Sequence, residues 1–235
     1  MKIEGRNAVL ELLKTEKTID KLMIRKGDER SLGRIFSAAR EKGIKVQFCD
    51  GKVLDKESET GRHQGVIAYV SEYEYADLSE LTEGDSSGLV IVCDGVEDVH
   101  NFGSILRVAE CAGAAGVIIP KNKSAQVTGA VVRISEGAAS HVKVARVPGV
   151  NYAVDELQKH GYWVYALEAE GEDLYSSDLT GKVALVVGGE HSGVGALTKK
   201  KCDKILSLPL AGKVNSLNAS VALGIAVYEA VRQRR

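Results

Sequence analysis

Residues 88–210 alternate short apolar runs with helical segments, and this alternation restricts the chain to a few folds. The run GLVIVCD at 88–94 is continuous and rich in β-branched residues, which is typical of a strand covered on both faces. Further strand-like runs lie at 116–120, 142–147, 162–168, 182–189 and 204–210. Helical spacing follows at 103–114, in the first part of 125–139 and at 151–161. This order predicts an α/β fold with a parallel sheet and helices on both faces.

Residues 1–71 predict a smaller α/β unit. Helices are expected at 5–16 and 31–43, and strands at 19–25, 44–49 and 64–70. The next stretch, 72–87, holds six Asp and Glu, no Lys or Arg and few aliphatic residues, so it is interpreted as an acidic linker. The expected domains are therefore 1–71, the linker 72–87, and 88–235.

Composition narrows the function classes. The chain is 44% hydrophobic and 27% charged, as in ordinary globular proteins, and no apolar run reaches the length of a membrane span. An N-terminus without a signal-peptide core and four cysteines without a CxxC pair predict a cytoplasmic protein with no metal site. Residues 1–71 carry 15 Lys and Arg against 11 Asp and Glu, which suits either a polyanionic partner or an ordinary surface.

The first of three polar loops at strand ends is DGVEDVHNFGSILRVAE, residues 94–110. Asn101 is expected to cap the helix that follows. Arg107 lies on that helix in an otherwise apolar stretch and needs a partner. A salt bridge to Glu110 or Asp94 would supply one, and so would an anionic substrate.

The second loop, VVGGEHSGVGAL at 186–197, holds four glycines after an apolar strand. Such a loop turns at positive φ or approaches another group closely. It is not a phosphate-binding P-loop, because Val194 and Gly195 stand where Lys and Ser or Thr are required. Glu190 has the wrong sign for phosphate and suits hydroxyls or a cationic ligand, although it could also cap a helix.

The third loop, SLPLAGKVNSLNAS at 207–220, leads into a mostly apolar helix. That helix is preceded by four polar residues, Asn215, Ser216, Asn218 and Ser220. One N-cap needs only one of them, so capping explains one or two of the four.

Together the three loops resemble the motifs of the SpoU-type branch of the SPOUT superfamily, the RNA ribose 2′-O-methyltransferases. NFGSILRVAE is similar to the first motif, LVVGGEHSG to the second and LSLPLAGKVNSLNASVALGIAVYE to the third. Leu208, Leu210 and Ala219 are conservative departures. The N-terminal extension and the closing YEAVRQRR most resemble bacterial enzymes that methylate a guanosine ribose in 23S rRNA.

The resemblance implies a C-terminal trefoil knot, S-adenosylmethionine as cofactor, and a homodimer with its active site near the subunit interface. It implies that the N-terminal unit is an L30e/L7Ae-like RNA-binding domain, and that the substrate is RNA rather than DNA because the target is a 2′-hydroxyl. The catalytic residues implied are Asn101, Arg107, Glu190, Ser216 and Asn218. The cofactor-binding residues implied are Leu167, Gly188, Gly189, Leu208 and Leu217.

Chemistry refines these roles. A guanidinium resists deprotonation, so Arg107 is expected to hold a phosphate and stabilise the developing alkoxide rather than act as a base. Asn101 would orient the ribose or Arg107, and Glu190 would fix its loop and bond to Arg107. His100 and His191 are expected to pack or hydrogen-bond rather than catalyse.

Alternatives to an rRNA methyltransferase remain open. They are a tRNA ribose methyltransferase and a non-catalytic RNA-binding assembly factor. A third alternative, a nucleotide hydrolase, is disfavoured because the chain lacks the lysine of a P-loop. Candidate RNA contacts in the N-terminal unit, which could equally be surface loop residues, are Arg6, Asn7, Arg62, His63 and Gln64.

Overall fold

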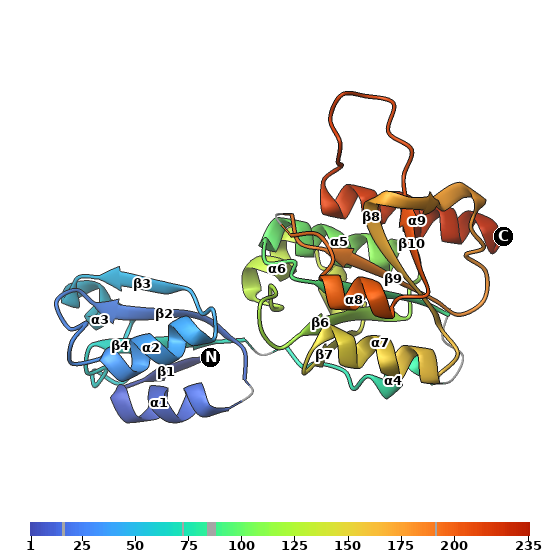
Figure 1. Ribbon diagram of the computed structural model, residues 1–235. Coiled ribbons are helices and arrows are strands. Elements are labelled where there is room, and N and C mark those ends of the chain that lie inside the picture. Colours follow the sequence, from blue (N-terminus) through green and yellow to red (C-terminus); the bar gives the residue numbers. More distant parts are fainter. Residues whose placement is uncertain (16, 72, 84–87, 191) are drawn as a thin grey trace. The chain divides into compact units, whose positions relative to one another are not determined.

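The computed structural model describes residues 1–15, 17–71, 73–83, 88–190 and 192–235 (Figure 1). The chain divides into two compact units. The N-terminal unit comprises Met1–Glu74 with Val127–Gly129, and the C-terminal unit comprises Tyr75–Gln126 with Ala130–Arg235. Among the described residues, no helix is both long and apolar enough to cross a membrane.

The N-terminal unit is built on a four-stranded sheet in the order β1-β4-β2-β3. Its strands are β1 (Lys2–Glu4), β2 (Ile19–Arg25), β3 (Val46–Cys49) and β4 (Val66–Val70). Its helices are α1 (Arg6–Lys14), α2 (Gly33–Glu41) and α3 (Gly51–Glu57). Helices α1 and α2 pack on one face through residues such as Val9, Leu12 and Ile35, whereas Leu54 of α3 packs with Met23 and Ile67 in a separate cluster.

The C-terminal unit contains a six-stranded sheet, wholly parallel, in the order β10-β8-β9-β5-β6-β7. The strands are β5 (Leu89–Asp94), β6 (Gly116–Pro120), β7 (Val144–Val147), β8 (Trp163–Asp173), β9 (Val183–Gly188) and β10 (Lys204–Ser207). The helices are α4 (Ser79–Thr82), α5 (Val99–Cys111), α6 (Gly129–Ile134), α7 (Val150–Lys159), α8 (Ala196–Lys201) and α9 (Ala219–Gln233). The predicted parallel α/β fold is confirmed.

Helices cover both faces of this sheet (Figure 1). Val90 and Val92 pack with Val154 of α7 in the core of one face. Because strand side chains alternate, Ile91 and Cys93, also fully buried, face the opposite side, where α5 and α9 pack together. Burial on both faces explains why the apolar run at 88–94 is continuous.

The stretch 72–87, interpreted as an acidic linker, packs on the C-terminal unit at the residues that the structure describes. Ala76 pairs with Ala145 beside β7, and the side chain of Leu81 is fully buried in the core of the α7 face. The hydroxyl of Tyr162 donates a hydrogen bond to the Leu81 carbonyl. The few aliphatic residues of this acidic stretch are thus the ones that anchor it, while residues 72 and 84–87 lie outside the described part of the chain.

Candidate active site

A cavity of about 460 Å³ lies beside the C-terminal end of β9 and the middle of β8, where β8 stops pairing with β9. Three segments far apart in the sequence line it, namely 167–169, 187–190 with Gly193, and residues between 206 and 222. A break in strand pairing forms its first wall. Ile205 pairs with Ala166 but the next residue, Leu206, pairs with Glu172, so residues 167–171 of β8 leave the ladder with β10. The carboxyl ends of parallel strands are where α/β sheets bind ligands.

The glycine-rich loop at 188–195 forms the second wall through very close backbone packing. A Cβ on Gly188 would lie 2.0 Å from the carbonyl carbon of Gly193, and one on Gly189 would lie 2.1 Å from the carbonyl oxygen of Gly95. Gly193 has a φ of 60°, in the left-handed region. Both reasons for glycine that the sequence suggested, close approach and positive φ, therefore apply in this loop.

Two carboxylates hold the same loop by its backbone. Glu168 Oε1 accepts a hydrogen bond of 2.6 Å from the Val194 amide, and Asp94 Oδ2 accepts one of 2.9 Å from the Gly195 amide. The loop therefore directs these N–H groups at acidic side chains of the protein. This arrangement is the opposite of a phosphate cradle, in which such groups point at a bound anion.

The polar residues at the start of α9 form the third wall; they cap the helix and also bond to α5. Asn218 is the N-cap, and its Oδ1 accepts hydrogen bonds from the backbone amides of Ser220 and Val221. Its Nδ2 donates a hydrogen bond of 2.9 Å to Oδ1 of Asn101, and the Ser220 hydroxyl donates one of 3.2 Å to the same oxygen. Capping alone does not account for these residues, because they also connect α9 to α5.

Asn101 does not cap α5, contrary to the expectation. Asp98 does so, since its Oδ1 accepts hydrogen bonds from the amides of His100 and Asn101. Asn101 is instead a buried residue, 8% exposed, and its side chain bonds to α9. Helix α5 therefore begins at Val99, two residues before Asn101. Sequence alone did not identify which of the polar residues in this loop would be the N-cap.

Arg107 lies on the exposed side of α5 and does not line the cavity of its own chain. Among the described residues it forms no ion pair or hydrogen bond, so the expected partners Glu110, Asp94 and Glu190 do not hold it. Glu190 is also exposed, but it does line the cavity. An exposed arginine without an internal partner remains available for an external anion.

The structure brings most of the predicted site residues together. The five expected cofactor residues, Leu167, Gly188, Gly189, Leu208 and Leu217, all line the cavity. So do Glu190, Ser216 and Asn218, and Asn101 joins them through its bond to Asn218. Sequence reasoning missed Glu168 and the loop-holding role of Asp94. Each of the two is the acidic residue that ends an apolar run of the sequence, Asp94 in 88–94 and Glu168 in 162–168.

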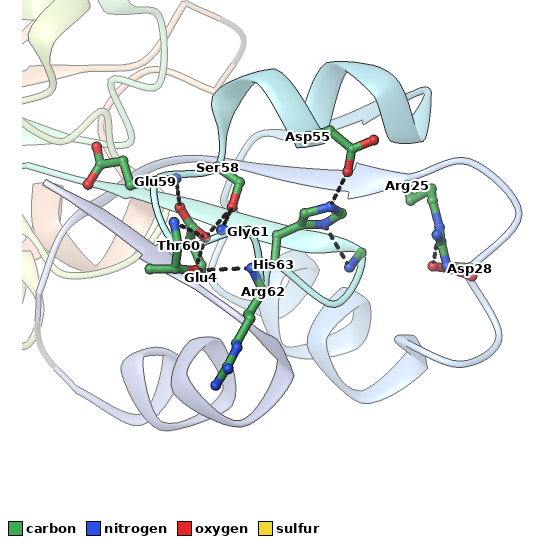
Figure 2. Close-up of polar contacts among 11 residues, drawn as sticks. Glu4, Arg25, Asp28, Asp55, Ser58, Glu59, Thr60, Gly61, Arg62 and His63 are labelled. Atoms are coloured by element: carbon green, nitrogen blue, oxygen red, sulfur yellow. Dashed lines mark hydrogen bonds and ion pairs between the residues drawn. The ribbon is translucent and has the colours of Figure 1, made fainter.

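In the N-terminal unit, a recess of about 590 Å³ gathers four of the five candidate RNA contacts, Arg6, Asn7, His63 and Gln64, together with Arg25 and Gly65. His63 is a structural residue there. Its Nδ1 accepts a hydrogen bond from the Gly65 amide, so Nε2 carries the proton and donates to Asp55 (Figure 2). Arg62 is exposed and does not line the recess.

The loop that carries Arg62 is organised by Glu4. Its carboxylate accepts hydrogen bonds from the Ser58 hydroxyl, the Glu59 amide, and the Thr60 amide and hydroxyl (Figure 2). Burial raises the pKa of Glu4, but these hydrogen bonds outweigh it and lower the pKa to about 2.

Comparisons with known proteins agree with this arrangement. The SpoU rRNA Methylase family profile matches residues 88–228, more than half of the chain, and a profile described as RNA 2′-O ribose methyltransferase substrate binding matches residues 2–76. The chain belongs to the SpoU rRNA methylase family. The resemblance inferred from the three motifs is confirmed, and with it the class of activity, methyl transfer to an RNA ribose 2′-hydroxyl.

Several SpoU relatives match over nearly the whole chain. YacO of Bacillus subtilis (strain 168), named as a member of the TrmH family of tRNA/rRNA methyltransferases, is 40% identical and the match covers 98% of this chain and 94% of YacO. The 23S rRNA (guanosine-2′-O-)-methyltransferase RlmB of Xylella fastidiosa (strain 9a5c) is 42% identical over 99% of this chain and 96% of RlmB. The crystal structure of the SpoU methyltransferase AviRb from Streptomyces viridochromogenes in complex with AdoMet shares the fold, with a TM-score of 0.64, 24% identity and coverage of 99% of this chain and 90% of AviRb.

Proposed function

We propose that this protein methylates the ribose 2′-hydroxyl of a guanosine in 23S rRNA, with S-adenosylmethionine as the methyl donor. The observation that carries the proposal is the cavity lined by residues of the second and third SpoU motifs. The first motif joins it through the hydrogen bond between Asn101 and Asn218. Relatives named as 23S rRNA guanosine methyltransferases match both units of the chain at about 40% identity. S-adenosylmethionine would supply an electrophilic methyl group on a sulfonium.

The cavity fits this donor on its own chemistry. Its volume of about 460 Å³ lies within the range of small-molecule sites. Leu167, Leu208 and Leu217 supply apolar surface for an adenine ring, and Gly188 and Gly189 line the cavity without a side chain that would fill it. The carboxylates that line the cavity suit a positively charged ligand.

Asn101, Ser216 and Asn218 hold the acceptor side of the site. The bond between Asn101 and Asn218 fixes both amides, so that Ser216 and the free Asn101 Nδ2 can orient a ribose. Fixed positioning of the reacting groups contributes up to roughly 7–11 kcal/mol in favourable cases. The guanidinium of Arg107 binds the neighbouring phosphate and stabilises negative charge that develops on the 2′-oxygen.

Arg107 points to a homodimer as the active form. It lies outside the cavity of its own chain, so a second copy would bring its Arg107 to the cavity of the first. The surface of α9 supports such pairing, because Val221 and Tyr228, seven residues apart on one helix side, are each half exposed. A site completed across a two-fold interface is self-complementary.

The finer features of the fold are inferred from family membership. We infer a trefoil knot in which the chain after β10 passes through a loop, which is supported by the position of β10 at the sheet edge and the return of α9 to pack against β9 and α5. We infer that the N-terminal unit is an L30e/L7Ae-like domain that selects the RNA, that residues 88–235 form the catalytic domain, and that the protein works in the cytoplasm.

Transfer of labelled methyl from S-adenosylmethionine to undermethylated 23S rRNA, with the position mapped in the product, tests the proposal. The expected result is one ribose 2′-O-methylguanosine in rRNA. Preferential labelling of tRNA would instead support the runner-up, a tRNA ribose methyltransferase; the name of YacO includes both tRNA and rRNA. Label on a base, or no label on any RNA, would refute the proposal, and in the second case an RNA-binding assembly factor would replace it.

A further inference from the structure

The charged side chains that the structure describes in the lining of the donor cavity are all negative. Among its described lining residues the only charged side chains are two carboxylates, Glu168 and Glu190. The rest are apolar residues, glycines, Ser216 and Asn218. A pocket with this lining attracts cations and gives no electrostatic stabilisation to an anion.

Glu168 is the better fixed of the two carboxylates. It leaves the β8–β10 ladder with residues 167–171, and its Oε1 accepts the 2.6 Å hydrogen bond from the Val194 amide. Its side chain is 21% exposed, whereas Glu190 is an exposed residue. Gly193 gives it room, since a Cβ there would lie 2.6 Å from Glu168 Oε1.

One internal cation faces Glu168. Lys199 Nζ of α8 lies 3.6 Å from Oε2, with a third of its side chain exposed. A pair this long and this exposed interacts weakly, so Lys199 reduces the negative charge at the cavity without cancelling it.

Methyl transfer changes the charge of the bound nucleoside. S-adenosylmethionine carries a sulfonium, an ammonium and a carboxylate, and therefore one net positive charge. The product S-adenosylhomocysteine has a neutral thioether and no net charge. A fixed carboxylate beside the cavity interacts differently with the two, although their shapes differ by one methyl group.

We propose that Glu168 is a specificity residue that makes the cavity prefer the cationic methyl donor over its neutral product. This inference rests on the proposed function and goes beyond it, since it assigns a role to a residue outside the three motifs. Electrostatic preference for the donor lowers product inhibition, because the sulfonium charge that strengthens binding disappears in the reaction.

The test is calorimetric titration of the full-length protein with both ligands. Glu168→Gln keeps an acceptor oxygen for the Val194 amide and removes only the charge. For one charge at a partly exposed site, we expect the Kd of S-adenosylmethionine to rise roughly fivefold and that of S-adenosylhomocysteine to change less than about twofold. Glu170→Gln, an exposed carboxylate on the same strand that does not line the cavity, should change neither.

Two further titrations test whether charge is the cause of the preference for the donor. Sinefungin, which carries an ammonium group near the position of the sulfonium, should follow S-adenosylmethionine in its response to Glu168→Gln. Lys199→Gln should strengthen the preference for the donor. Equal weakening of both nucleosides by Glu168→Gln, or a sinefungin response like that of the product, would overturn the inference while leaving the proposed function intact. Failure of the wild-type protein to bind either nucleoside would instead refute the proposed function.

Discussion

The hydrogen bond between Asn218 and Asn101 can be tested separately from the helix cap that the same residue provides. Asn218→Asp retains an oxygen for the amides of Ser220 and Val221, and Asp is as good an N-cap as Asn. It removes the Nδ2 donor and places two acceptor oxygens about where a 2.9 Å bond now lies. The loss of one buried hydrogen bond with an acceptor left facing it costs about 1–2 kcal/mol.

A double-mutant cycle isolates this interaction. The free energy of unfolding would be measured by urea denaturation for the wild type, Asn218→Asp, Asn101→Ala and the double variant. In the Asn101→Ala background there is no Oδ1 to repel, so Asn218→Asp should cost at least 1 kcal/mol less than in the wild type. Costs that add within about 0.5 kcal/mol would show that the two amides are not coupled and would refute the reasoning.

Three other perturbations follow from the described geometry. Gly188→Ala places a methyl group 2.0 Å from the backbone of Gly193, so it should displace the loop and abolish S-adenosylmethionine binding in calorimetry, whereas retained binding would contradict the loop geometry. Arg107→Ala should lower methylation of RNA at least about a hundredfold while leaving donor affinity unchanged, since Arg107 is proposed to contact the RNA phosphate and the 2′-oxygen rather than the methyl donor; unchanged methylation would remove it from the mechanism. The lowered pKa of Glu4 means that its contribution to the stability of the N-terminal unit is complete above about pH 4.5 and is lost as the pH falls toward 2; Glu4→Gln should flatten that acid dependence in thermal unfolding, and an identical profile would oppose the assignment.

The fold was predictable from sequence wherever one physical signal dominated. Continuous β-branched runs indicated buried parallel strands, and the runs at 88–94 and 182–189 became the adjacent strands β5 and β9. The acidic stretch misled for the opposite reason. Its charge and its few aliphatic residues suggested a linker between domains, but apolar side chains such as Leu81 pack it against the sheet. The composition of a sequence segment does not predict a tertiary contact that so few of its residues make.

The sequence predicted which residues belong to the candidate site, but it did not predict which groups those residues contact. Loops with surplus polar groups pointed to Asn218 and Ser216, and family resemblance added their neighbours. The pairing break that exposes Glu168 and the choice of Asp98 over Asn101 as N-cap depend on how distant segments meet. Sequence periodicity does not predict contacts between distant segments. The roles of Glu168 and Asp98 were therefore identified only from the structure.

The three walls of the cavity also set an order of events during synthesis. Residues near 167 are translated long before those near 217, yet both must be present to enclose a ligand. A growing polypeptide therefore has no complete donor site until α9 has been made. The newborn protein gains its complete methyl-donor site only at the last stage of its production. C-terminal truncation directly after β10 would leave all six strands of the sheet but remove Ser216, Leu217 and Asn218 from the site.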